Sequence, residues 1–372
     1  MAGWRKPCGN RRFPLSLVDR FRRWWRGHPL AATEPAAPPP PGRKRGVVDH
    51  VIILDGTLSS LEPGGETNAG ILFKLLREGG HSVHRTVYYE PGIQWEGWRN
   101  ISAIAQGRGI DFQIRRAYGY LASHYREGDR IFLFGYSRGA FAVRSLAGVI
   151  DRVGLLRRDH ATERGVVLAF RHYQMNPDST AARAFAHRFC HFEAPVQMVG
   201  VWETVKALGL RLPLLWMLTD NQYAFHNHHL GSSIRHGFHA LALHENRVAF
   251  QPVLWDCPEG WEGNIEQVWF RGAHGDVGGQ LGDFLAARPL ANIPLVWMLD
   301  RAETVGLALP PGWRERFPCD PDAPMSGTWQ GWGKWFLIRS RRVVGRDPSE
   351  RIHPTAERPR TRWPFGCSTR QI

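Results

Sequence analysis

The sequence predicts an α/β fold, in which a mostly parallel sheet carries helices on both of its faces. Three observations support this class. Short continuous apolar runs recur along the chain, as expected of strands that are buried on both faces. Stretches with helical periodicity separate these runs, and such alternation is typical of parallel sheets. Hydrophobic residues make up 43% of the 372 residues, which is enough to fill a core.

The first elements follow one another in strand–helix order. Residues 50–54 are a continuous apolar run and are expected to form a buried strand. Residues 68–78 carry apolar side chains at helical spacing and end before a Gly-Gly pair, so a helix is expected there. Residues 83–89 have the pattern of a strand, and residues 111–126 show a second amphipathic helix.

The pattern continues in the second half. Residues 130–134 form the next apolar run, which leads directly into a predicted helix over 138–150. Further strands are expected at 196–201 and 265–270, and a further helix at 293–305. The region exceeds a minimal domain, so we also expect insertions over one edge, near the mouth of the site.

Positive charge is concentrated at the two ends of the chain. The formal net charge is +14, of which residues 1–50 contribute +8 and residues 339–372 contribute +6. The neutral region between them does not favour nucleic acid as a partner. We therefore predict a basic N-terminal segment with a Pro-rich linker over 1–47, an α/β-hydrolase-like domain over 48–338 and a basic C-terminal tail over 339–372.

Residues 17–26 form a basic amphipathic pattern. Apolar residues occupy one face at helical spacing, and four arginines occupy the other. Two interpretations remain open: an interfacial helix in peripheral contact with anionic membranes, or a helix that docks on its own domain. The cysteines are scattered, and no apolar run approaches the ~20 residues of a spanning helix, so the expected location is cytoplasmic.

The segment Gly135-Tyr136-Ser137-Arg138-Gly139 contains the pattern G-x-S-x-G. It follows a predicted buried strand and opens a predicted helix, which is the setting of a nucleophile elbow. There the Ser137 hydroxyl can attack a substrate, and the Arg138 amide at the helix N-terminus can stabilise an oxyanion. The alternative is an ordinary capping serine in a glycine-rich turn. We take Ser137 as the candidate nucleophile.

A serine nucleophile needs a base, and the base needs an acid that orients it. His274, in a glycine-rich loop just after a predicted strand, is the candidate base. Glu203, at the end of the strand 196–201, is the candidate acid, and Asp276 or Asp256 are the alternatives. The order Ser, acid, His along the chain is that of α/β-hydrolases.

The loop after the first strand is the candidate second half of an oxyanion hole. The backbone amide of Gly56 or of Thr57 is expected to provide the second donor beside that of Arg138. Asp55 is expected to support this loop, as Asp276 is expected to support the segment around the candidate base.

Histidines are dense in one part of the chain and invite a metal hypothesis. No H-E-x-x-H or comparable metal-binding spacing is present, so neither a metal nor a cofactor is expected. We expect these histidines on the surface or around the site, on an insertion near its mouth. They are His226, His228, His229, His236, His239 and His244.

Several motifs, taken together, carry a resemblance to a known family. The sequence resembles the uncharacterised α/β-hydrolase domain family that also supplies the catalytic domain of type VI secretion phospholipase effectors. The resemblance spans about residues 48 to 310 and rests on motifs that occur in a fixed order. These are Asp55-Gly56-Thr57, Thr67-Asn68, Gly128-Asp129-Arg130, Phe134 to Ala140, Arg144, Gly154-Leu155-Leu156, Gly200 to Val205, His239 to Leu243, Phe250 with Pro252, and Gln267 to Gly279.

The resemblance implies a Ser–Asp–His triad at Ser137, position 203 and His274. Position 203 is Glu in this sequence, and His244 stands where the family often has an acid. A Glu can serve as the acid, because the imidazole needs only a carboxylate at Nδ1–H, provided that the extra methylene is accommodated.

We therefore expect a serine hydrolase that cleaves carboxylic esters through an acyl-enzyme on Ser137. The secreted effectors make phospholipid or lipid-like esters the implied substrates. The alternative is a catalytically weak or inactive hydrolase-fold module that acts in membrane or partner binding.

Overall fold

The computed structural model describes residues 46–78, 82–92, 108–205, 230–257, 264–329 and 336–357. Residues 47–372 form one compact unit. The amphipathic pattern at 17–26 and the histidines at 226–229 lie outside the described residues. Within the described part, no helix is long and apolar enough to cross a bilayer.

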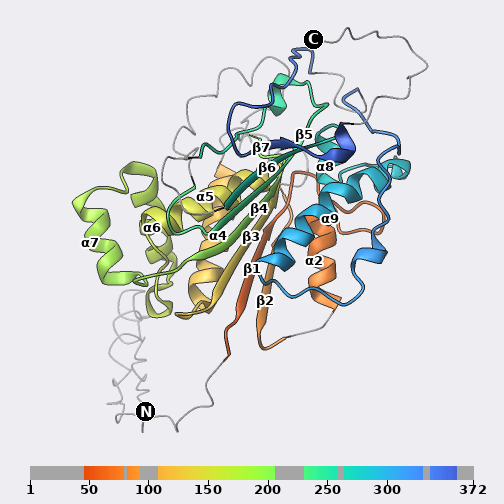
Figure 1. Cartoon of the computed structure of the whole chain (residues 1–372). Coiled ribbons are helices and arrows are strands. Elements are labelled where there is room, and N and C mark those ends of the chain that lie inside the picture. The colour runs from red at the N-terminus through yellow and green to blue at the C-terminus, as the bar shows by residue number, and fades with distance from the viewer. Residues whose placement is uncertain are drawn as a thin grey trace, which may run out of the picture. The chain divides into compact units, whose positions relative to one another are not determined.

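A seven-stranded sheet forms the centre of the molecule (Figure 1). Its strand order is β2-β1-β3-β4-β5-β6-β7, and every neighbouring pair is parallel. The predicted parallel α/β architecture is therefore confirmed. The strands are β1 (Asp49–Leu54), β2 (Arg85–Glu90), β3 (Arg130–Tyr136), β4 (Val196–Trp202), β5 (His236–Ala242), β6 (Asn264–Phe270) and β7 (Glu350–Ile352).

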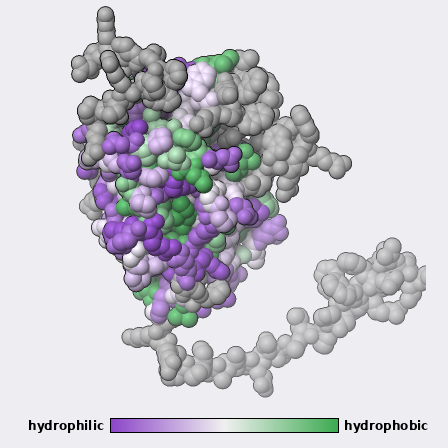
Figure 2. All heavy atoms as spheres, turned by 90° about the vertical axis from the view of Figure 1, so that its right-hand side faces the viewer, coloured by the Kyte–Doolittle hydropathy of each residue, from purple (hydrophilic) through white to green (hydrophobic). Residues whose placement is uncertain are grey.

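Helices cover both faces of the sheet. On one face lie α4, α5 and α6, and on the other lie α2 and α9 (Figure 1). Figure 2 views the molecule from the side of α2 and α9, where hydrophilic and hydrophobic residues are intermixed on the surface. The α-helices of the described residues are α2 (Asn68–Glu78), α4 (Arg108–His124), α5 (Arg138–Arg152), α6 (Glu163–Met175), α7 (Thr180–Phe189), α8 (His274–Gly278) and α9 (Arg288–Thr304).

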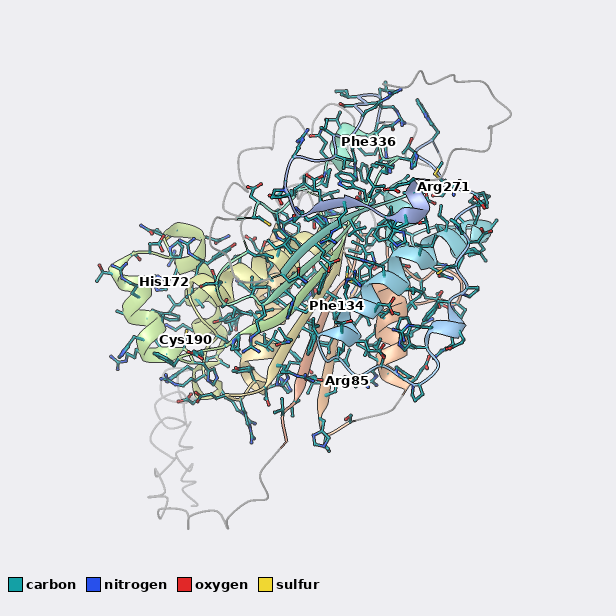
Figure 3. The ribbon with its side chains drawn as sticks, viewed as in Figure 1. Arg85, Phe134, His172, Cys190, Arg271 and Phe336 are labelled. Atoms are coloured by element: carbon teal, nitrogen blue, oxygen red, sulfur yellow. The ribbon has the colours of Figure 1, made fainter. Side chains whose placement is uncertain are left out.

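The apolar runs of the sequence are explained by two separate cores. Successive side chains of a strand point to opposite faces. In β1, Ile52 and Leu54 belong to the core under α4 and α5, whereas Val51 and Ile53 belong to the core under α2 and α9. A strand whose side chains enter both cores is therefore apolar over most of its length, as β1 is from Val51 to Leu54. Phe134 of β3 lies in the middle of the molecule (Figure 3).

The sheet is larger than the sequence pattern indicated. No strand was expected over His236–Ala242, which the structure shows as β5 between β4 and β6. The three residues of β7 follow position 338, where the domain was expected to end, and they pair with β6 through Gln267–Trp269. Part of the expected basic tail therefore contributes to the sheet.

Candidate active site

The carboxyl ends of the parallel strands bring the candidate residues to one edge of the sheet, where α/β folds usually bind their ligands. Asp55 follows β1, Ser137 follows β3 and Glu203 follows β4, and His274 comes shortly after β6. Figure 3 shows the polarity of the sheet: Arg85, which begins β2, lies at the lower end, and Arg271, just after β6, lies at the upper end.

Ser137 occupies a sharp turn between β3 and α5. Its backbone has φ 56° and ψ −118°, a strained conformation for a residue with a side chain. The flanking glycines permit this turn, because a Cβ at Gly139 would lie 2.0 Å from the Leu54 carbonyl oxygen, and one at Gly135 would lie 2.6 Å from the Gly139 oxygen. Ser137 therefore lies at a sharp junction between a strand and a helix.

Three side chains form a continuous hydrogen-bonded row at this edge. The distance from His274 Nε2 to Ser137 Oγ is 2.9 Å, and that from His274 Nδ1 to Glu203 Oε2 is 3.1 Å. His274 is the first residue of the short helix α8, where a loop was expected. Glu203 shares with Ser137 a positive φ, here 50°.

The ionisation state of Glu203 determines which nitrogen of His274 carries the proton. Burial opposes ionisation, but the charge of Arg342 and the hydrogen bonds from His274 and Arg342 hold the pKa of Glu203 well below its usual range. An ionised carboxylate only accepts, so His274 Nδ1 carries the proton and Nε2 accepts from the Ser137 hydroxyl. Burial lowers the pKa of His274, against the hydrogen bond and charge of Glu203, which favours the neutral ring.

The guanidinium of Arg342 is a part of the site that the sequence did not predict. Arg342 Nη1 lies 2.6 Å from Glu203 Oε1, and Nη2 lies 2.8 Å from Oε2. The side chain of Arg342 is 4% exposed and that of Glu203 is 0% exposed. Arg342 belongs to the segment that was expected to be a basic tail, and no local pattern distinguishes it from the other arginines there.

A second buried carboxylate, that of Glu245, also lies against His274. Glu245 follows β5 and accepts from the backbone N–H of His274 at 3.2 Å, while its carboxylate pairs with Arg247 at 2.6 Å. It therefore contacts the backbone of the candidate base, whereas Glu203 contacts the ring. Next to it, His244 accepts through Nδ1 from the Gly272 amide at 3.1 Å.

The alternative acids have other partners. The Asp276 carboxylate accepts from the backbone N–H groups of Ala273 at 2.8 Å and Ser326 at 2.7 Å. Asp276 therefore fixes the turn that begins α8, consistent with a supporting position. Asp256 is exposed. Of the three candidate acids, Glu203 is the one that meets the imidazole.

Two aromatic rings hold the imidazole of His274. The ring of Tyr136 lies at a centroid distance of 5.1 Å, and that of Phe250 packs edge-on at 4.9 Å. Ser137 is 2% exposed and His274 4% exposed. The row of hydrogen bonds therefore lies in a largely dry environment, in which electrostatic interactions are stronger than in water.

The loop after β1 meets the elbow. Asp55 accepts from the Gly56 amide at 2.7 Å, the Thr67 hydroxyl at 2.7 Å and the Tyr89 hydroxyl at 2.8 Å. Burial nevertheless raises the pKa of Asp55 to about 6. The Gly56 N–H is thus engaged within the loop. The Thr57 hydroxyl is buried and has no hydrogen-bond partner.

The histidines described between 230 and 244 are not on an insertion, contrary to expectation. His236 and His239 lie in β5, and His239 is fully buried, with Nε2 accepting from the Thr204 amide at 3.3 Å. Burial lowers the pKa of His239 to about 3, so the ring is neutral. Among the described residues, no group of three or more His, Cys, Asp or Glu is placed to hold a metal.

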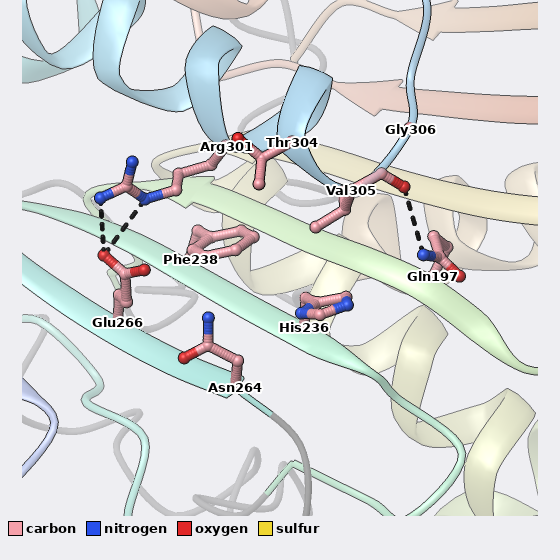
Figure 4. Close-up of a pocket in the computed structure, with 9 residues that line it drawn as sticks. All are labelled: Gln197, His236, Phe238, Asn264, Glu266, Arg301, Thr304, Val305 and Gly306. Atoms are coloured by element: carbon pink, nitrogen blue, oxygen red, sulfur yellow. Dashed lines mark hydrogen bonds and ion pairs between the residues drawn. The ribbon is translucent and has the colours of Figure 1, made fainter.

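A cavity of about 480 Å³ lies at the opposite, amino end of the sheet (Figure 4). Gln197, His236 and Asn264 line it from the starts of β4, β5 and β6, and the last turn of α9 closes one side. The Glu266–Arg301 ion pair spans part of it at 3.0 Å. None of the candidate site residues lines this cavity.

Comparisons with known proteins place the chain in a family. The family model described as the catalytic domain of Tle1-like phospholipase effectors of the type VI secretion system matches residues 49–301. An uncharacterised protein of Saccharomyces cerevisiae is 29% identical over 231 residues, which cover 55% of this chain and 32% of the yeast protein. The chain therefore spans about a third of the length of this relative.

Two proteins of known structure also match parts of this chain. An uncharacterised protein from Pseudomonas aeruginosa is 16% identical with a TM-score of 0.43, covering 74% of this chain and 49% of that one. The Tle1 effector bound to the VgrG spike is 16% identical with a TM-score of 0.34, covering 65% of this chain and 53% of that one. Since the family model matches more than half of the sequence, the chain belongs to the family of Tle1-like catalytic domains of type VI secretion phospholipase effectors.

Proposed function

We propose that this chain is a serine hydrolase that cleaves carboxylic esters through an acyl-enzyme on Ser137. The observation that carries the proposal is the row from Ser137 Oγ through His274 to Glu203, with distances of 2.9 and 3.1 Å. Membership of a phospholipase family supports a hydrolase. In this role Ser137 is the nucleophile, His274 the general base and then acid, and Glu203 the acid that orients the imidazole.

The reaction has two halves. Ser137 Oγ bonds to the ester carbonyl carbon while its proton passes to His274 Nε2, and the carbonyl oxygen becomes an oxyanion. The bond to the leaving alkoxide then breaks, and His274 gives the alkoxide its proton. In the second half, water gives a proton to His274 and its oxygen attacks the acyl carbon. Ser137 leaves with the proton returned from His274, and the acid product is released.

Two backbone amides are the proposed oxyanion donors. The amide of Arg138 lies at the start of α5, where the helix dipole favours negative charge. Because the Gly56 N–H donates to Asp55, the amide of Thr57 is the better second donor of the two that the sequence suggested.

Lipid esters are the proposed substrates, because the family is that of phospholipase effectors. We further propose that residues 17–26 recruit the protein to anionic membranes, with arginines and tryptophans entering the interface. Co-sedimentation with anionic vesicles tests this by comparing the full chain with a chain that starts at Gly42. Equal binding of both, or binding that is indifferent to salt, would contradict recruitment.

An activated-serine fluorophosphonate probe tests the enzyme itself. We expect it to label the wild type and the matched control Ser123→Ala, but not Ser137→Ala. A panel of short and long acyl esters, phospholipids and lysophospholipids then defines the substrate, with the same three proteins. A folded wild type that is neither labelled nor active on the panel would favour a non-catalytic module instead.

A further inference from the structure

The strongest unassigned feature of the molecule is the buried arginine behind the candidate acid. We propose that Arg342 is a positioning residue: it fixes the carboxylate of Glu203 against His274 and so makes the segment 336–342 part of the active site. This inference rests on the proposed function.

Four hydrogen bonds hold the guanidinium. Two go to the oxygens of Glu203, at 2.6 and 2.8 Å. The others go to the carbonyl oxygens of Ala242 at 2.8 Å and Phe250 at 2.6 Å. Arg342 therefore joins the ends of β4 and β5 to the turn at Phe250, whose ring packs on His274. A planar, two-pronged arginine restricts a carboxylate far more than a single contact does.

The geometry explains how a glutamate serves at position 203. A Glu side chain has one more rotatable bond than Asp, so its carboxylate must be fixed by external contacts. Oε1 of Glu203 accepts from the Ala242 amide at 2.6 Å and from Arg342, whereas Oε2 accepts from His274 and Arg342. Without Arg342, each oxygen of Glu203 keeps only one hydrogen bond. The orientation of the carboxylate plane is then less restricted.

Arg342 also balances charge beside the imidazole. Glu203 is fully buried, and its negative charge stabilises a protonated His274, which cannot act as a base. The positive charge of Arg342 offsets this influence. Among the residues that the structure describes, the other charged groups that face His274 are Glu245 and Arg247, which pair with each other. Loss of Arg342 therefore leaves the site with an uncompensated negative charge.

The segment that carries Arg342 is docked by its backbone. The Val248 N–H donates to the Ile338 carbonyl at 3.1 Å, and the Ser340 N–H donates to the Asn246 carbonyl at 2.8 Å. The ring of Phe336 packs edge-on against that of Phe250 at 5.4 Å. All of these contacts involve residues beyond position 301, where the family match ends.

The test compares full-length wild type with Arg342→Gln, Arg342→Lys and the exposed neighbour Arg341→Gln as a matched control. The rate of fluorophosphonate labelling is measured across pH, together with the melting temperature. Arg342→Gln should label about 10²-fold more slowly. The midpoint of the acid limb of the curve of labelling rate against pH should rise by about one pH unit, because His274 stays protonated to higher pH. Arg342→Lys keeps the positive charge but not the two-pronged guanidinium. Its labelling rate and acid-limb midpoint should therefore lie between those of wild type and Arg342→Gln. Arg341→Gln should match the wild type.

The outcomes separate this inference from the proposed function. An unlabelled wild type contradicts the proposed function itself. A labelled wild type with equal rates and equal acid limbs for a folded Arg342→Gln overturns the positioning role. A lower rate with an unmoved acid limb in both Arg342 variants also overturns it, because that result indicates a structural role alone. Where Arg342→Gln does not fold, the rate and acid limb of Arg342→Lys decide.

Discussion

The two ends of the parallel sheet hold their charged groups differently. At the carboxyl end, Glu203 and Glu245 are almost completely buried and both lie against one histidine. At the amino end, the pairs Asp49–Arg130 and Glu266–Arg301 reach solvent through arginines that are 36% and 34% exposed.

The strained backbone conformations also lie at the carboxyl end of the sheet. Among the described residues other than glycine, those with positive φ are Leu58, Ser137 and Glu203, which follow the carboxyl ends of β1, β3 and β4. Such conformations cost about 1–3 kcal/mol each and persist where the surroundings enforce them. Substitutions at the carboxyl end should therefore change activity more than stability, and those at the amino end should change stability alone.

The largest effect is expected at the base. His274→Ala should lower ester turnover by about 10⁴-fold or more with the cooperative unfolding transition preserved. The double variant Ser137→Ala/His274→Ala should be no slower than either single variant, because the residues act as a unit. Steady-state kinetics on the best ester of the panel measures this. Multiplying losses in the double variant would argue against a shared mechanism.

Substitution of the candidate acid, Glu203, should lower both activity and stability. Glu203→Gln should lower kcat by about 10³–10⁴-fold. It should also lower the unfolding free energy by about 3 kcal/mol, because Arg342 is left buried without its ion pair. The variant Glu203→Gln/Arg342→Gln should regain part of this stability and none of the activity. Urea unfolding and kinetics on both proteins check the prediction, and normal turnover by Glu203→Gln would require another acid.

A smaller effect is expected at Thr57. Its buried hydroxyl has no partner, and it lies in the loop that we propose to supply an oxyanion donor. If the Thr57 hydroxyl donates to the oxyanion in addition to the two amides, Thr57→Val, which keeps the amide, should lower kcat by about 10²-fold. The melting temperature should stay equal or rise, because an unsatisfied polar group is removed. Thr57→Ser, which keeps the hydroxyl, is the control. Equal kcat values for Val and Ser would limit the role of Thr57 to its amide.

The contribution of Asp55, at the carboxyl end of the sheet, to the unfolding free energy should depend on pH. Burial raises its pKa to about 6 from an ordinary value of 3.8, so the folded state binds its proton more tightly than the unfolded state. Its contribution is thus fully present below pH 3.8 and is lost as pH rises through 6. From pH 4 to pH 7, wild type should lose about 2–3 kcal/mol relative to Asp55→Asn. Parallel stability curves for the two proteins would contradict this.

The smallest effect is expected at the amino end. Glu266→Gln removes a partly exposed ion pair with Arg301, and such pairs are typically worth less than about 1 kcal/mol. Ester turnover should be unchanged. Denaturant unfolding with parallel kinetics measures both quantities, and a clear loss of turnover would show that the two ends of the sheet are coupled.

The sequence predicted those parts of the fold that depend on local pattern. The helix α2 has the predicted bounds 68–78, and β1, β3 and β6 lie within two residues of theirs. The sharp turn at Ser137 could also be predicted, because the neighbouring glycines are needed where the backbone of the turn packs closely. In contrast, β5 contains Gly, Ala and two His, whose weak preference for strands hides a position in the middle of the sheet.

The partners of buried charges could not be predicted in the same way. Arg342 and Glu203 are 139 residues apart, and a run of arginines gives no sign of which one enters the core. Glu245 was missed for the same reason, because no local pattern shows that its carboxylate lies against His274 in the fold. Glu203 was found because it follows a predicted strand, lies between Ser137 and His274 in the chain, and stands at the acid position that the family resemblance implies.

The docking of Arg342 also has a consequence for the order in which this protein is made. A ribosome releases residues 49–301 before residue 342, so the growing chain can assemble most of its sheet while Glu203 still lacks its cationic partner. During that interval the carboxylate must stay hydrated or take up a proton, because an unpaired charge is not stable in a dry core. The final set of contacts around the imidazole therefore forms only after residue 342 has left the ribosome.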